Sequence, residues 1–188
     1  MTTLEDLITR RFECVTTFED GGISTVEFLE ASEGVVKLFD ILGSTAFYPK
    51  VRAKYSSDPV AFDTLQKIII AEAVTKNRTA TQGLLWLKRG LEMTALGLKR
   101  NLDNKDEALS DSFTKAYEAT LRQYHNFIVK NMFSVAMYAC PSRETFYEKI
   151  GGNNDRVHDG LLKWVEALQS LLNELNIFYA SESYDKGL

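Results

Sequence analysis

The segment TATQGLLWLKRGLEMTALG, residues 79–97, predicts a long helix with glycines repeated along one side. At helical spacing Gly83, Trp86, Gly90, Met93 and Gly97 share one stripe. Each glycine inside a helix costs about 1 kcal/mol relative to alanine, so something must approach this stripe closely. That group is either a neighbouring helix, which makes Trp86 an ordinary core aromatic, or a ligand. A flat indole suits a sugar ring, whose C–H face is apolar and whose hydroxyls point outward.

The rest of the chain also has apolar residues at helical spacing, and no run of two-residue alternation indicates a strand. We therefore predict an all-α fold. Two helix starts have sequence signals, the capping-box pattern Ser24-Thr25-Val26-Glu27 and the dipeptide Asp58-Pro59. The predicted helices cover about residues 3–14, 25–42, 59–75, 79–100, 111–139 and 143–150, followed by a last helix with an apolar seam from Val157 to Phe178.

The composition is that of an ordinary globular domain. The 188 residues are 45% hydrophobic and 26% charged, and no repeat or linker indicates a second domain, so we predict one domain over residues 1–188. The net charge of −4, without a basic block, argues against nucleic acid as a partner. Cys14 and Cys140 are too few for a disulfide framework. With no signal peptide and no apolar run of about 20 residues, we expect a cytoplasmic protein.

Patterns of common catalytic and metal sites are absent from the sequence. His125 and His158 are the only histidines, and there is no His-Glu-x-x-His pair, phosphate-binding glycine loop or Gly-x-Ser-x-Gly elbow. We predict no catalytic residue, no metal site and no cofactor. His125 shares its side of the predicted helix with apolar residues, so spacing alone leaves open whether it is a satisfied core residue or a ligand-binding group.

Several motifs taken together resemble the glycolipid transfer protein family. Their order and separation match that family over roughly residues 26–180. The resemblance implies a two-layer sandwich of helices, a sugar site at the surface and an apolar tunnel between the layers for the ceramide chains. The motifs are Phe28-Leu29-Glu30-Ala31, Phe39-Asp40-Ile41-Leu42-Gly43-Ser44, Leu85-Trp86-Leu87-Lys88-Arg89-Gly90-Leu91, Lys115-Ala116-Tyr117-Glu118, Tyr124-His125 and Tyr138-Ala139-Cys140-Pro141.

The resemblance also implies roles for single residues. Trp86 would stack under the first sugar, and His125 would donate a hydrogen bond to the acyl-amide carbonyl. Lys50 takes the place of a lysine that completes the headgroup site, and Phe127 matches an aromatic residue used for membrane contact. The implied apolar tunnel positions are Phe39, Phe47, Met93, Leu121, Phe133 and Met137.

The sequence departs from the family pattern after Pro49. In the family, the stretch represented here by Phe47-Tyr48-Pro49 leads into a helix with an Asp and an Asn that bind the sugar hydroxyls and the ceramide amide. Here Lys50 follows directly, and about a dozen residues, roughly three helical turns, are missing. The Asp and the Asn therefore have no counterparts. An incomplete gene model, a segment absent from the chain as given, and a divergent protein with altered ligand choice are the open explanations.

The function implied by the resemblance is intracellular transfer of glycosphingolipids between membranes, without catalysis. The protein would dock transiently on a membrane surface, extract one glycosphingolipid and release it elsewhere. Two alternatives stay open. One is a lipid-sensing or scaffold module with the same fold and reduced transfer. The other is a ceramide-1-phosphate carrier, because a related branch of the superfamily carries that lipid with a cationic cluster in place of the tryptophan. Trp86 favours a sugar over a phosphate.

Overall fold

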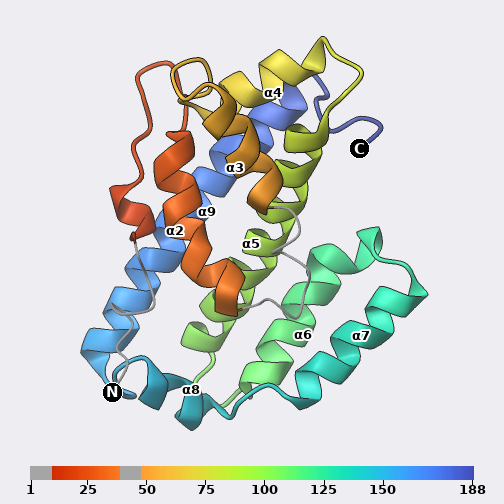
Figure 1. The fold of residues 1–188 in the computed structure, drawn as a ribbon. Helices are drawn as coiled ribbons and strands as arrows, with labels where there is room; N and C mark the ends of the chain where they lie inside the picture. The colour runs from red at the N-terminus through yellow and green to blue at the C-terminus, as the bar shows by residue number, and fades with distance from the viewer. Residues whose placement is uncertain (1–9, 39–47) are drawn as a thin grey trace.

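The computed structural model describes residues 10–38 and 48–188, with side chains for 10–33 and 48–188. Within these residues the structure is helical, and the only β pairing consists of two isolated bridges, Thr17 with Ile23 and Ser24 with Thr64. The all-α prediction is confirmed (Figure 1). The elements are η1 (Phe12–Cys14), α2 (Thr25–Leu38), α3 (Tyr48–Ser57), α4 (Leu65–Ala73), α5 (Thr79–Asp103), α6 (Leu109–Ala119), η4 (Leu121–Tyr124), α7 (Phe127–Tyr138), α8 (Arg143–Lys149) and α9 (Asp155–Ser181).

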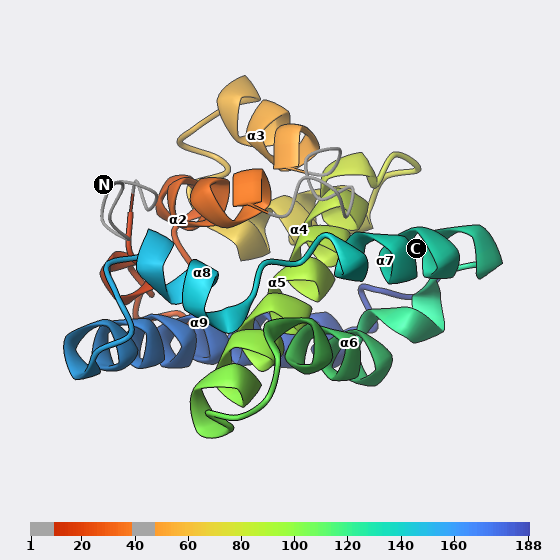
Figure 2. The same cartoon turned by 90° about the horizontal axis from the view of Figure 1, so that it is seen from below.

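The helices lie in two layers, as the family resemblance implied. In Figure 2, α2, α3, α7 and α8 lie on one side, with α6 and α9 on the other. The long helix α5 connects the two groups, because it packs against α3 and α4 as well as against α6 and α9. Apolar side chains from both layers form one buried cluster that extends from Phe12 to Tyr179. Every described helix that carries a predicted site residue is thereby anchored on one core.

Two local features explain the course of α5. A Cβ atom added to Gly97 would lie 2.9 Å from the ring of Phe113 on α6, so a neighbouring helix does approach the glycine stripe at this end. At the other end, the carboxylate of Glu72 accepts hydrogen bonds from the backbone N–H groups of Ala80 and Thr81 at 3.3 and 2.8 Å. A negative charge stabilises the first turn of a helix, where N–H groups lack partners within the helix.

The prediction of one helix over residues 111–139 is wrong. The structure divides this segment into α6, η4 and α7. Thr120 leaves the helical region with φ −120° and ψ −78°. The side chain of Asn126 then accepts a hydrogen bond from the N–H of Val129 at 3.0 Å, which starts a new helix. The two bends occur without proline or glycine, and they place His125 in a connection and not inside a helix.

The prediction of a helix over residues 59–75 is wrong in its first part. Asp58 caps only a single turn, because its Oδ1 accepts from the N–H of Ala61 at 3.0 Å and the chain then extends at Thr64. Thr64 pairs with Ser24, and its side chain caps α4 through the N–H of Lys67. Before this turn lies α3, a helix that the sequence analysis did not predict.

The remaining predicted helices agree with the structure within a few residues, with two exceptions near the N-terminus. The start of α2 at Thr25 is confirmed, but the capping box is not formed, because Glu27 accepts from the N–H of Thr16 at 2.7 Å instead. Residues 39–42 of the predicted helix over 25–42 lie outside the described part. Of the predicted helix over 3–14, the described part contains only the short turn η1.

Candidate functional site

Trp86 on α5 and His125 before α7 lie side by side. Their rings are nearly parallel, with centroids 5.7 Å apart and planes inclined by 10°. Tyr124 meets the indole edge-on at 6.3 Å. Trp86 and His125 are both half-buried. The break between α6 and α7 makes this arrangement possible. It places Tyr124 and His125 in a connection, from which both of their rings reach Trp86 on α5.

Arg89, one turn after Trp86 on α5, joins the aromatic rings of this site. Its guanidinium carbon lies 3.6 Å from the centroid of Tyr124 and 5.1 Å from that of Trp86. Arg89 is buried, so these cation–π contacts are partly desolvated and hold both rings in position. Arg89 was not among the predicted site residues, although its spacing of three residues from Trp86 places both side chains on one face of the helix.

Tyr117 on α6 also contacts His125. Its hydroxyl oxygen lies 3.1 Å from Nδ1 of His125. The Tyr117 ring is stacked on Phe133 with centroids 3.7 Å apart and is buried at 4% exposure. Burial lowers the pKa of His125, and the charge of Lys130 lowers it further. Burial also raises the pKa of Tyr117, so both groups are neutral near pH 7.

Lys50, the third predicted headgroup residue, lies in the first turn of α3 and is half-buried. Because α3 packs against α2 and α5, Lys50 belongs to the layer that faces the helix of Trp86. Its contribution to the headgroup site stays a prediction. α3 is held locally by a hydrogen bond of 2.7 Å from Arg52 to the hydroxyl of Tyr48, one turn apart.

The predicted tunnel residues fall into three groups. Met93 and Leu121 are buried in the core, on α5 and η4. Phe133 and Met137 line a cavity of about 530 Å³ between α6 and α7. Phe39 and Phe47 lie outside the described residues. The structure thus brings two of the predicted positions together at one cavity, and the tunnel itself stays a prediction.

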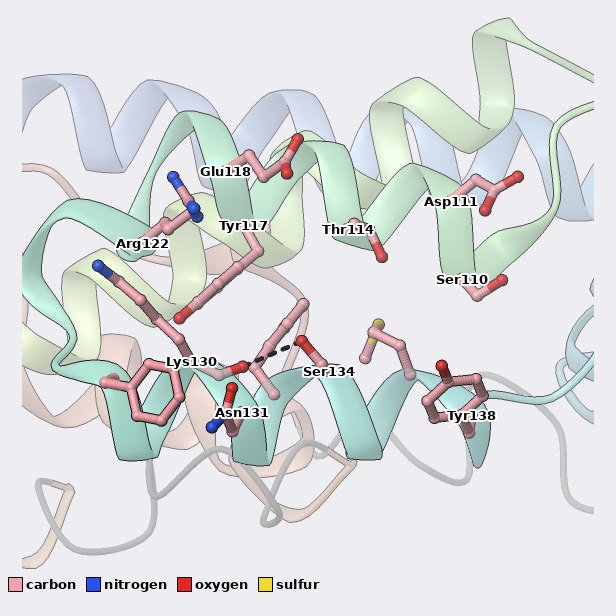
Figure 3. Close-up of a pocket in the computed structure, with 13 residues that line it drawn as sticks. Ser110, Asp111, Thr114, Tyr117, Glu118, Arg122, Lys130, Asn131, Ser134 and Tyr138 are labelled. Atoms are coloured by element: carbon pink, nitrogen blue, oxygen red, sulfur yellow. Dashed lines mark hydrogen bonds between the residues drawn. The ribbon is translucent and has the colours of Figure 1, made fainter.

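The cavity between α6 and α7 has distinct ends (Figure 3). Arg122 and Lys130 lie at one end together with Tyr117. Ser110 and Asp111 lie at the other end, on the first turn of α6. Glu118 lies beside Arg122 at the cationic end, and the apolar residues Phe133 and Met137 also line the cavity.

Several large apolar side chains of α7 are exposed. Phe127, the predicted membrane contact, is 75% exposed at the first position of this helix. Large apolar side chains are normally buried, so a group of exposed ones on a single helix marks a contact surface. The other exposed large apolar residues of α7 are Ile128, Met132, Val135 and Tyr138.

The described residues form neither a metal-binding cluster nor a membrane-spanning helix. No group of three or more His, Cys, Asp or Glu side chains there is arranged to hold a metal ion. Among the same residues, no helix has the length and apolar character needed to cross a membrane.

Comparison with known proteins assigns this arrangement to a family. The profile of the glycolipid transfer protein family matches residues 23–152, more than half of the chain. The chain belongs to the glycolipid transfer protein family. The match includes α5 with Trp86 and the connection with His125, so the two residues of the parallel ring pair both lie in the family's own domain.

Relatives of this family cover the chain almost completely. A glycolipid transfer protein of Aureobasidium melanogenum is 43% identical over 190 residues, 96% of this chain and 94% of that protein. The crystal structure of HET-C2, a fungal glycolipid transfer protein, is 35% identical with a TM-score of 0.89, covering 97% of this chain and 99% of its own.

Less similar relatives include proteins that are longer than this chain. A solved structure of FAPP2, described as selecting simple glycosphingolipids with the glycolipid transfer protein fold, is 30% identical with a TM-score of 0.79, covering 97% of this chain and 96% of its own. The chain spans only about a third of the length of one longer relative in Danio rerio, 35% of a pleckstrin homology domain-containing protein.

Proposed function

We propose that this chain, as a single domain, transfers glycosphingolipids between membranes by enclosing one lipid at a time. The observation that carries the proposal is the parallel pair of Trp86 and His125 at the protein surface, in a chain of the glycolipid transfer protein family. In this proposal the exposed part of the indole stacks on the first sugar, His125 donates a hydrogen bond to the lipid amide, and Lys50 binds the headgroup from α3.

The physical problem that such a protein solves is desorption of the lipid. Each methylene moved from bilayer to water costs about 0.8 kcal/mol, so a chain of about sixteen carbons faces a barrier on the order of 13 kcal/mol. Apolar protein contacts remove most of this cost. In the proposal, the buried residues Met93, Leu121 and Phe133 supply such contacts, together with Met137, Phe39 and Phe47.

Docking on a membrane is assigned in the proposal to α7. Phe127 and the other exposed apolar residues of this helix insert at the interface, where buried apolar area drives binding. The cavity lined by Phe133 and Met137 lies directly against this helix. A lipid that leaves the bilayer there has a short path to apolar side chains.

The proposed setting is the cytoplasm, and the proposed mechanism contains no catalytic step. Cys14 and Cys140 are both free thiols, as expected for a reducing compartment. The protein takes up and releases the lipid through non-covalent contacts with the membrane and with the lipid. No covalent bond of the lipid is made or broken.

Mass spectrometry of the purified protein tests the proposal against its two alternatives. Protein expressed in a host that makes glycosylceramides should carry one glycosylceramide per chain. Recovery of ceramide-1-phosphate would identify the alternative cargo. Protein that is consistently empty, from a host with abundant glycosylceramide, would favour the lipid-sensing or scaffold module and contradict transfer.

A further inference from the structure

The two cations of the cavity between α6 and α7 have no carboxylate partner among the residues that the structure describes. Figure 3 shows Arg122 from η4 and Lys130 from α7 at the same end of the cavity. Within the described part of the chain, neither side chain has a carboxylate oxygen within 4.0 Å of its nitrogens. Glu118 lines the same cavity from α6, but it makes no such pair with them.

Unpaired cations that share a cavity repel each other, and an anion placed between them removes that repulsion. Each charge affects the pKa of one neighbouring ring, Tyr117 or His125. Arg122 pulls the pKa of Tyr117 down against the rise caused by burial, and Lys130 lowers the pKa of His125. Both cations line the cavity together with Tyr117, whose hydroxyl in turn contacts His125.

The surroundings of the cavity indicate where the anion comes from. Phe127, which also lines the cavity, is one of the exposed apolar residues of α7. Apolar side chains inserted at an interface bring adjacent cations to the depth of the phosphates. A volume of about 530 Å³ is in the range of small-molecule sites and has room for a lipid headgroup.

Polar groups at the cationic end suit a phosphate. A guanidinium presents paired N–H donors that match phosphate oxygens, and an ammonium adds a compact second charge. Asn131 lines the cavity one residue after Lys130 and provides an amide donor.

We propose that Arg122 and Lys130 bind the phosphate of an anionic membrane phospholipid in the cavity between α6 and α7 while the protein is docked. This phospholipid is not the cargo, whose headgroup is assigned to Trp86 and His125. The proposal rests on the proposed function, since it describes the donor or acceptor membrane of the same transfer cycle.

The test is vesicle flotation at physiological salt with phosphatidylcholine vesicles that contain or lack phosphatidylglycerol. The unaltered protein should bind the anionic vesicles roughly thirtyfold more tightly, as expected for two cations at an anionic surface. The variant Arg122→Gln with Lys130→Gln should lose this preference. Arg156→Gln with Lys163→Gln, which removes the same charge from exposed positions of α9, is the matched control and should retain it.

The outcomes that would overturn the proposal are specific. Equal binding of the unaltered protein to both kinds of vesicle would overturn it, as would an equal loss of preference in the cavity variant and the control. Circular dichroism checks that all proteins are folded. Arg122→Lys gives a second measurement, since it should retain most of the preference by keeping the charge.

Free phosphate could occupy the same two cations as a lipid phosphate. Nuclear magnetic resonance of labelled Arg122 and Lys130 side chains, titrated with inorganic phosphate, measures its binding. Saturation by phosphate that also removes the vesicle preference supports a lipid headgroup at this site, whereas an unchanged vesicle preference at saturating phosphate would overturn the lipid source. Transfer of glycosylceramide between vesicles without phosphatidylglycerol tests the proposed function separately, so the two proposals can fail independently.

Discussion

The hydroxyl of Tyr117 lies 3.1 Å from Nδ1 of His125 and determines which ring nitrogen of the histidine carries the proton. A phenol is a stronger donor than a neutral imidazole N–H, and an imidazole nitrogen is the stronger acceptor, so the Tyr117 hydroxyl donates. The proton of His125 then lies on Nε2. A donor at Nε2 is the form that a lipid amide carbonyl requires.

The variant Tyr117→Phe tests this relationship, because it keeps the stacked ring and removes only the hydroxyl. We expect a larger population of the Nδ1–H tautomer, seen in the nitrogen chemical shifts of His125, and glycosylceramide binding about fivefold weaker, the equivalent of one hydrogen bond. Tyr147→Phe removes another buried hydroxyl, which donates to Asn101 at 3.3 Å, and is the control. Unchanged tautomer shifts in Tyr117→Phe would refute the assignment.

His125→Leu removes the proposed donor and keeps an apolar side chain of similar size. Lipid binding should weaken by about 1 kcal/mol or more, since the amide carbonyl loses its partner. The measurement is a binding titration monitored by tryptophan fluorescence. His158→Leu, which removes a hydrogen bond to Asn153 and an edge-on ring contact with Tyr147, should bind normally. Equal affinity in the unaltered protein and His125→Leu would show that His125 does not touch the lipid.

His125 also makes a prediction about pH. Burial holds its pKa below the ordinary 6.5, so the unfolded chain takes up this proton at a higher pH than the folded protein. The stability that the neutral ring contributes is complete above pH 6.5 and is lost as the pH falls from there through the lowered folded-state pKa. Urea unfolding across this window should show a smaller pH dependence for His125→Leu. Identical slopes in both proteins would contradict the buried, neutral histidine.

Periodicity predicted the helices well where one apolar face continues, as in α5 and α9. It failed where the chain bends without glycine or proline. Between Ala119 and Phe127 the helix is interrupted while the helical spacing of apolar residues continues. Only Thr120 and Asn126, which flank the interruption, indicate it in the sequence. At Thr64 a bridge to Ser24, made by a distant part of the chain, overrides the local helix signal of Asp58-Pro59. Such contacts join segments that are far apart in the sequence, so the residues around Thr64 alone do not indicate them.

The site could be predicted only in part for the same reason. Spacing alone left Trp86 and His125 undecided between core and ligand roles, and the family resemblance was needed to favour the ligand. The structure adds that their rings are parallel. Tyr117 was quoted as a family motif without a role, because its contact with His125 depends on the break after α6. Arg89 was missed because a basic residue on a helix is usually solvated.

The missing segment after Pro49 can be tested by restoring it. A chain with the family's connecting residues inserted between Pro49 and Lys50 regains an Asp and an Asn for the headgroup. Each charge-assisted hydrogen bond is worth roughly 1.5–3 kcal/mol, so affinity should rise by about a hundredfold or more, with sharper selection of glycosylceramide over ceramide-1-phosphate. Stability should rise too. If the chain as given already binds as tightly, the missing groups are supplied from elsewhere, with Lys50 and Asp40 as the candidates.

The most direct test of glycolipid transfer is the rate at which Trp86→Ala moves a fluorescent glycosylceramide between vesicles. The control is Trp164→Ala. Trp164 packs in the core against Phe12 with ring centroids 5.1 Å apart, so its removal should lower the free energy of unfolding by about 3–5 kcal/mol. We predict that the unaltered protein transfers the lipid and that Trp86→Ala, with a native helical circular-dichroism spectrum, does not. Normal transfer by a folded Trp86→Ala protein would contradict the account, because Trp86 would then be only a packing residue.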